Sequence, residues 1–193
     1  MSLSSEKKQT FRHRCGTAVC TSIDGPGPLV VMVHGWSCRA EYWQAQVDAL
    51  RGQQALMLID LPGHGEAPAP TSDLNIDALA DVVRSICEAN EHQRFVLVGH
   101  SMGGAVVLEA ACKLRQAVAG VLLADTFLIN YGELDEATIG AYYDPFAQDF
   151  RAAVNNLVDN CAGEKTRAET RARLKAGMGA GDPAVMLPLW NSL

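Results

Sequence analysis

The stretch "RFVLVGHSMGGAVVLEAA" (94–111) constrains the fold more than any other part of the chain. It begins as an apolar run of strand length and continues as a helix, and the two meet at Ser101 with no room for a loop. So sharp a turn needs small residues two positions before and after the serine, and Gly99 and Gly103 stand there. The pattern G-x-S-x-G between a strand and a helix therefore predicts a serine whose hydroxyl is presented as a nucleophile.

Strand-like and helix-like segments alternate along residues 29–125. Two short strands joined at Gly16 are expected before them, in residues 11–23. Alternation of this kind indicates βαβ units, which build a parallel sheet with helices on both faces. The helix that follows Ser101 is apolar almost all round, so we expect it to be buried, with Glu109 and Lys113 as its exposed pair. The expected strands are 29–35, 55–65, 94–100 and 118–125, and the expected helices are 41–51, 76–87 and 103–115.

From residue 127 onward the pattern is helical, and no strand-like segment follows residue 125. Asp144 is expected to cap the first of these helices, with Pro145 at its first helical position. We therefore predict two parts, an α/β core in residues 1–126 and a helical cap in residues 127–193. The expected cap helices lie within 144–160, 164–178 and 182–193.

Taken in order, residues 11–126 resemble the α/β-hydrolase superfamily. "VVMVHGW" (30–36) is similar to its third strand and oxyanion-hole loop, and "LIDLPGHGEAP" (58–68) to its fourth strand and the following loop. "LVGHSMGG" (97–104) is similar to its nucleophile elbow. The resemblance implies that Ser101 is the nucleophile. It also implies that the backbone N–H groups of Trp36 and Met102 form the oxyanion hole.

The sequence offers no obvious base for Ser101. In the α/β-hydrolase family the catalytic triad follows the chain order serine, acid, histidine, so the base is expected after the serine. All five histidines precede Ser101, and we expect structural roles for them. Direct proton transfer by His34 is the weaker alternative. The acid has two candidates, Asp125 at a strand end and Asp60, and both also suit structural hydrogen bonds. The histidines are His13, His34, His64, His92 and His100.

The resemblance further implies that the chain stops before the seventh strand, so that the C-terminal strands, the triad histidine and the acid are missing. Strand 118–125 would then be an open apolar edge, and we expect self-association through it or poor solubility. Removing the histidine of a serine protease costs on the order of 10⁶ in turnover. We therefore expect the chain as written to be close to inactive.

The expected activity is hydrolysis of a carboxylic ester, thioester or lactone through a Ser101 acyl-enzyme. Two alternatives remain: a non-catalytic binding or interaction protein, and a C–C hydrolase or cofactor-free peroxidase of the same fold. The expected partner is a small ester-like substrate, and the chemistry requires neither cofactor nor metal. A net charge of −6 argues against nucleic-acid binding. No apolar run reaches the roughly 18 residues of a membrane span or resembles a signal peptide, so the expected location is the cytoplasm.

Overall fold

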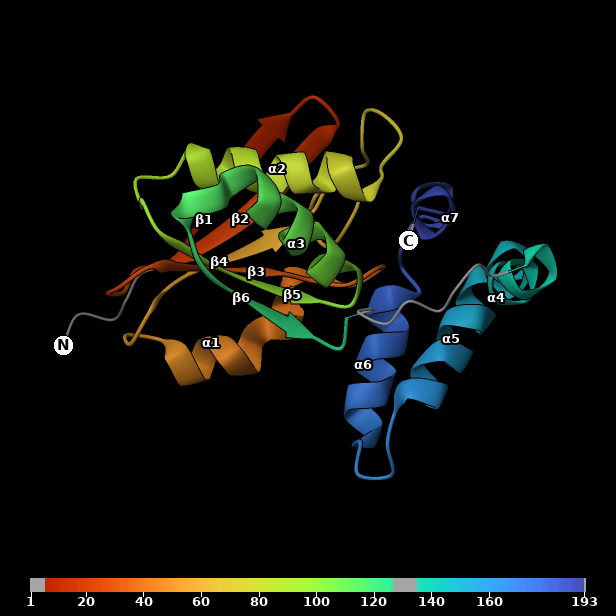
Figure 1. The fold of residues 1–193 in the computed structure, drawn as a ribbon. Coiled ribbons are helices and arrows are strands. Elements are labelled where there is room, and N and C mark those ends of the chain that lie inside the picture. Colours follow the sequence, from red (N-terminus) through yellow and green to blue (C-terminus); the bar gives the residue numbers. More distant parts are fainter. Residues whose placement is uncertain (1–5, 127–134, 193) are drawn as a thin grey trace.

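The structure is a computed structural model that describes residues 6–126 and 135–192. Within these residues six strands form one sheet in the order β1-β2-β4-β3-β5-β6 (Figure 1). β1 and β2 form an antiparallel hairpin that turns at Arg14 and Cys15, just before Gly16, while β3, β4, β5 and β6 run parallel. The predicted, mostly parallel sheet is therefore confirmed. The strands are β1 (Glu6–His13), β2 (Gly16–Ile23), β3 (Leu29–Val33), β4 (Ala55–Asp60), β5 (Phe95–His100) and β6 (Val118–Ala124).

Helices cover both faces of the sheet, as the alternation predicts. α1 (Gln44–Leu50), preceded by the 3₁₀ turn η1 (Ala40–Trp43), lies on one face, and α2 (Ile76–Glu88) and α3 (Met102–Leu114) lie on the other (Figure 1). A second 3₁₀ turn, η2 (Arg115–Ala117), leads into β6. Each face carries its own buried apolar cluster, the larger one beneath α2 and α3.

α2 illustrates how local sequence and packing agree. The Asn75 side chain accepts a hydrogen bond from the backbone N–H of Ala78 at 2.8 Å, which satisfies one of the unpaired donors at the start of the helix. Its buried residues repeat at helical spacing and face the sheet. These residues are Leu79, Ala80, Val82, Val83, Ile86 and Cys87.

α3 is less buried than the sequence suggests. Leu108 is 36% exposed and Cys112 is also exposed. The expectation of a helix buried all round is wrong, because a helix in this layer contacts the sheet and α2 but has an outer side. The predicted pair of Glu109 and Lys113 is present, and Lys113 also has closer partners on α2. Its ammonium lies 3.9 Å from Glu109, but it bonds Asp77 and Asp81 of α2 at 2.5 and 3.0 Å.

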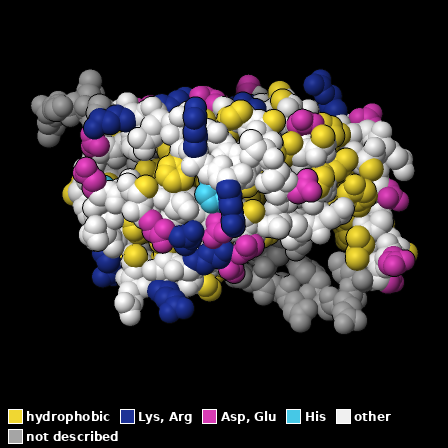
Figure 2. All heavy atoms as spheres, turned by 90° about the horizontal axis from the view of Figure 1, so that it is seen from above, with side chains coloured by type: hydrophobic (Ala, Val, Ile, Leu, Met, Phe, Trp, Pro, Cys, Tyr) yellow, Lys and Arg dark blue, Asp and Glu magenta, His cyan; other side chains and the backbone are white. Residues whose placement is uncertain are grey.

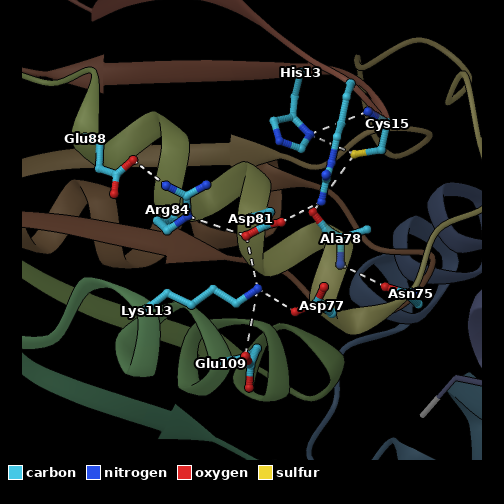
Figure 3. A network of polar contacts seen from close by, with 11 residues as sticks. His13, Cys15, Asn75, Asp77, Ala78, Asp81, Arg84, Glu88, Glu109 and Lys113 are labelled. Carbon is cyan, nitrogen blue, oxygen red and sulfur yellow. Dashed lines mark hydrogen bonds and ion pairs between the residues drawn. The ribbon is translucent and has the colours of Figure 1, made fainter.

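These contacts belong to a charged network that joins α3 to α2 and to the β1–β2 turn (Figure 3). Asp81 lies at its centre, with Arg14 at 2.8 Å and Lys113 at 3.0 Å. The hydrogen bond from Lys113 is the main reason why the pKa of Asp81 is lowered. Figure 2 views this side of the molecule, where side chains of both charges stand close together. The network thus connects the C-terminal end of α3 to α2.

Four further helices lie beyond the carboxyl ends of the parallel strands (Figure 1): α4 (Glu136–Gln148), α5 (Phe150–Cys161), α6 (Ala168–Met178) and α7 (Pro183–Trp190). No strand occurs within residues 135–192, as predicted. The predicted helix start at Asp144 is wrong. α4 runs through Pro145, which removes a single N–H near the end of the helix. The next helix begins instead at Asp149, whose side chain accepts from the N–H of Ala152 at 2.9 Å.

Across residues 6–126 and 135–192, no helix is both long and apolar enough to cross a bilayer. All six cysteines are free thiols, four of them buried, so none is paired in a disulfide.

Candidate active site

Ser101 lies between β5 and α3 in a strained backbone conformation. Its φ and ψ are 51° and −123°, a region that residues with a side chain rarely adopt. The Ser101 N–H donates to the carbonyl oxygen of Ala124 at 3.0 Å, and the N–H of Gly104 donates to the Ser101 carbonyl oxygen at 2.8 Å. Strain of this kind persists only where surrounding contacts hold it, and it concentrates at functional sites.

The glycines around Ser101 are required by close backbone approaches. A Cβ on Gly99 would collide with the backbone of Gly103, and a Cβ on Gly103 would lie 2.5 Å from the carbonyl oxygen of Val33. A Cβ on Gly104 would collide with the side chain of Thr126. The turn at Ser101 therefore requires glycine at positions 99 and 103, where the obstructing atoms belong to the backbone.

The loop after β3 lies directly beside Ser101. A Cβ on Gly35 would be 3.2 Å from the Cβ of Ser101. The loop turns back on itself through a bond from the Cys38 N–H to the Gly35 carbonyl oxygen at 3.1 Å, and Ser37 has a positive φ of 53°. Met102 occupies the first turn of α3, where backbone N–H groups have no acceptor within the helix. The backbones of residues 35–38 and 101–102 are thus brought together.

The Trp36 side chain is buried and points toward the C-terminal helices. Its Nε1–H donates to the carbonyl oxygen of Met186 at 2.8 Å. The ring packs edge-on against Phe146 of α4 and Trp190 of α7, with centroids 5.2 and 4.8 Å away, and against Phe150 of α5 at 5.7 Å. Trp36 therefore connects the loop after β3 to three helices at once.

His34 and His64 are buried and have structural partners. His34 Nδ1 donates to the Gly35 carbonyl oxygen at 2.8 Å, while its Nε2 accepts from the Leu61 N–H at 3.2 Å. His64 Nδ1 donates to the Pro62 carbonyl oxygen at 3.0 Å. Burial is the main cause that lowers the pKa of His34 to about 4 and that of His64 to about 3. Both rings are therefore neutral near pH 7.

The other three histidines, His13, His92 and His100, do not hydrogen-bond Ser101 in the described part of the chain. His13 Nδ1 is 3.1 Å from the Cys15 sulfur, and His92 Nδ1 is 2.9 Å from Asn90 Oδ1. His100 is half-buried, which lowers its pKa, and its Nδ1 approaches the same Gly35 that Ser101 contacts. None of the five rings hydrogen-bonds the Ser101 hydroxyl within residues 6–126 and 135–192.

The two candidate acids differ in their surroundings. Asp60 is buried and uses both oxygens, accepting from the N–H groups of Ala40 at 2.7 Å and Glu66 at 3.2 Å. Burial is the largest cause of its raised pKa. Asp125 is exposed at the end of β6, with a positive φ of 50°. Asp60 thus joins the loops after β3 and β4, while Asp125 lies at the carboxyl end of the sheet, as Ser101 does.

A cavity of about 230 Å³ opens beside the loop after β3. It is bounded by residues 37–39, by residues 63–69 and by the turn between α6 and α7, and Ser101 is not part of its wall. His64 lines it, and the Nε2 of His64 has no hydrogen-bond partner within the described residues. No group of three potential metal ligands occurs in the part of the chain that the structure describes.

The strand–elbow–helix geometry agrees with the comparison to known proteins. The model of the alpha/beta hydrolase family matches residues 30–192. The chain belongs to this family. It is 30% identical over 152 residues to the pimeloyl-[acyl-carrier protein] methyl ester esterase of Xylella fastidiosa strain M12, covering 78% of this chain and 58% of that protein. It is also 39% identical over 95 residues to the biotin biosynthesis bifunctional protein BioHC of Cellvibrio japonicus, covering 49% of this chain and 18% of that protein.

Solved structures share the fold at lower identity. An esterase from Exiguobacterium antarcticum superposes with a TM-score of 0.84 at 16% identity, covering 93% of this chain and 71% of that one. A bromoperoxidase from Bacillus anthracis superposes with a TM-score of 0.83 at 20% identity, covering 97% and 73%. The chain thus spans a little over half the length of the curated esterase and about seven-tenths of these two structures.

Proposed function

We propose that this alpha/beta hydrolase chain carries the nucleophile and oxyanion hole of a serine hydrolase that cleaves a carboxylic ester, thioester or lactone. The observation that carries the proposal is the strained elbow at Ser101, flanked by Gly99 and Gly103, where the backbone leaves no room for a side chain. The esterase similarity of the curated relatives supports the same class of substrate.

In this proposal a base removes the proton of the Ser101 hydroxyl while its oxygen attacks the carbonyl carbon. The N–H groups of Trp36 and Met102 bind the negative oxygen of the tetrahedral intermediate, and the positive end of α3 stabilises the same charge. Collapse expels the alcohol or thiol, which takes the proton from the base. Water then attacks the acyl-enzyme by the same route.

We assign the base and its acid to polypeptide outside these 193 residues. The support is the state of the five histidines: His34 and His64 are buried with structural bonds, and none of the five bonds the serine hydroxyl. We therefore expect the chain alone to turn over poorly. The same observation favours a second candidate, a non-catalytic binding protein that retains the elbow as scaffold.

The decisive experiment treats the chain with a fluorophosphonate and measures the intact mass, with and without imidazole in the buffer. We expect no adduct without imidazole and a slow single adduct on Ser101 with it, because imidazole can supply the missing base. The control is Ser101→Ala, which must stay unlabelled. An adduct without imidazole would place the base inside this chain. No adduct under either condition would favour the binding protein.

A further inference from the structure

The loop of residues 36–39 donates hydrogen bonds to the end of α6 and to α7. Three donors of the loop meet three carbonyl oxygens: Trp36 Nε1 with Met186 at 2.8 Å, Ser37 Oγ with Met178 at 2.7 Å, and Arg39 Nη2 with Gly177 at 3.4 Å. Gly177 and Met178 belong to the last turn of α6. Carbonyl oxygens in the last turn of a helix have no N–H donor within that helix. The loop after β3 therefore acts as the C-terminal cap of a helix about 140 residues further along the chain.

Ser37 is the unusual member of this set. Its φ of 53° lies in the left-handed region, where glycine is favoured and other residues are strained. It is nevertheless a serine, it is buried, and its hydroxyl donates to Met178. Gly181 makes room for it, because a Cβ at that position would collide with Ser37 Oγ. Two positions thus combine to preserve one hydrogen bond.

We propose that Ser37 is a positioning residue, whose bond to Met178 holds the loop so that the Trp36 N–H faces the oxyanion next to Ser101. This inference rests on the proposed function, since it concerns the same oxyanion hole. It implies that the position of α6 and α7 sets the geometry of the loop. Ser37 itself contacts neither the substrate nor the reacting atoms.

The proposal can be tested from both sides of the bond. Ser37→Gly removes the hydroxyl and also relieves the backbone strain, whereas Gly181→Ala displaces the hydroxyl and leaves Ser37 in place. Ser192→Ala is the matched control, because Ser192 Oγ donates to the Leu189 carbonyl oxygen at 2.8 Å at the end of α7, away from the loop.

Hydrogen exchange at the amides of residues 36–38 reports on the loop directly. We expect exchange to rise about tenfold or more in Ser37→Gly and in Gly181→Ala, and to stay unchanged in Ser192→Ala. In the double variant, Gly181→Ala should add little to Ser37→Gly, because the atom with which it collides is gone. Unchanged exchange, or fully additive effects, would overturn the proposal.

The imidazole-assisted labelling of Ser101 tests the positioning role. We expect its rate to fall about tenfold in both variants, less than the 10² to 10³ lost when an oxyanion donor is removed outright. If amide exchange of residues 36–38 rises but the labelling rate of Ser101 stays unchanged, the Ser37–Met178 bond does not position the Trp36 N–H. That result overturns this inference and leaves the proposed function intact. If the parent chain is not labelled at all, the proposed function fails and the positioning role fails with it.

Discussion

The indole Nε1 of Trp36 donates a hydrogen bond to the carbonyl oxygen of Met186, which lies 150 residues away in the sequence. The same residue supplies the backbone N–H that we assign to the oxyanion hole. One residue thus serves two parts of the molecule, with its backbone beside Ser101 and its ring among α4, α5 and α7. Packing of the C-terminal helices and the shape of the site are therefore coupled.

Replacing Trp36 with phenylalanine should destabilise the protein by about 1–3 kcal/mol, because the Met186 carbonyl loses a partner in a buried place. The measurement is the free energy of unfolding in urea. Trp43→Phe is the control, since Trp43 Nε1 is buried without a hydrogen-bond partner among the described residues. That variant should be neutral or slightly stabilising. Equal losses in the two variants would contradict the role of the Trp36 bond.

Replacing Gly103 with alanine should prevent the elbow from closing and lower the free energy of unfolding by several kcal/mol, on the order of the largest single-residue effects. The added Cβ would meet the backbone oxygens of Val33 and His34, which cannot move aside as a side chain can. Gly163→Ala is the control, because nothing lies within 4 Å of its Cβ position. A thermal midpoint of Gly103→Ala equal to that of the control would refute the prediction.

Stability should fall as the pH drops below about 6.5, since both His34 and His64 have lowered pKa values, about 4 and about 3. The unfolded chain binds their protons near pH 6.5 and the folded chain does not, so the stabilisation is complete above that pH and is lost toward pH 3–4. Asp60, whose pKa is raised mainly by burial, acts in the opposite direction, because the folded chain holds its proton more tightly than the unfolded chain.

Urea unfolding at pH values from 7 to 4 measures this effect. Two protons correspond to a slope of about 2.7 kcal/mol per pH unit, and His64→Gln should remove roughly half of it. A slope that His64→Gln leaves unchanged would show that His64 does not contribute to the acid sensitivity.

Self-association through β6 remains a prediction, and the structure gives it a specific surface. β6 is the last strand of the described sheet, and its side chains Val121 and Leu122 are 38% and 54% exposed. We expect light scattering to give a mass above that of the monomer, and Leu122→Lys to restore the monomer. Ile139→Lys, at a 48% exposed apolar residue of α4, is the control and should not change the mass. A parent chain that is monomeric at high concentration would contradict the prediction.

The segments with strong local signals could be predicted from the sequence. Asn75 and the apolar spacing behind it define α2, because a helix cap and a buried stripe involve residues only a few positions apart. The elbow at Ser101 could be predicted from its local glycine spacing, although the contacts that exclude a side chain at Gly103 come from Val33 and His34, at and just after the end of β3. The sequence predicts that α5 starts at Asp144, because Pro145 suits a first helical position. Only the folded chain selects Asp149 as the cap.

The sequence by itself therefore determined the α/β order, the elbow and the absence of a histidine after Ser101. The tertiary structure decided which residues the loop after β3 contacts. Ser37 has no sequence signal, because its positive φ is imposed by the fold and its acceptor, Met178, lies 141 residues away. Local patterns encode caps, turns and buried faces, whereas contacts between distant segments arise only when the sheet brings their ends together.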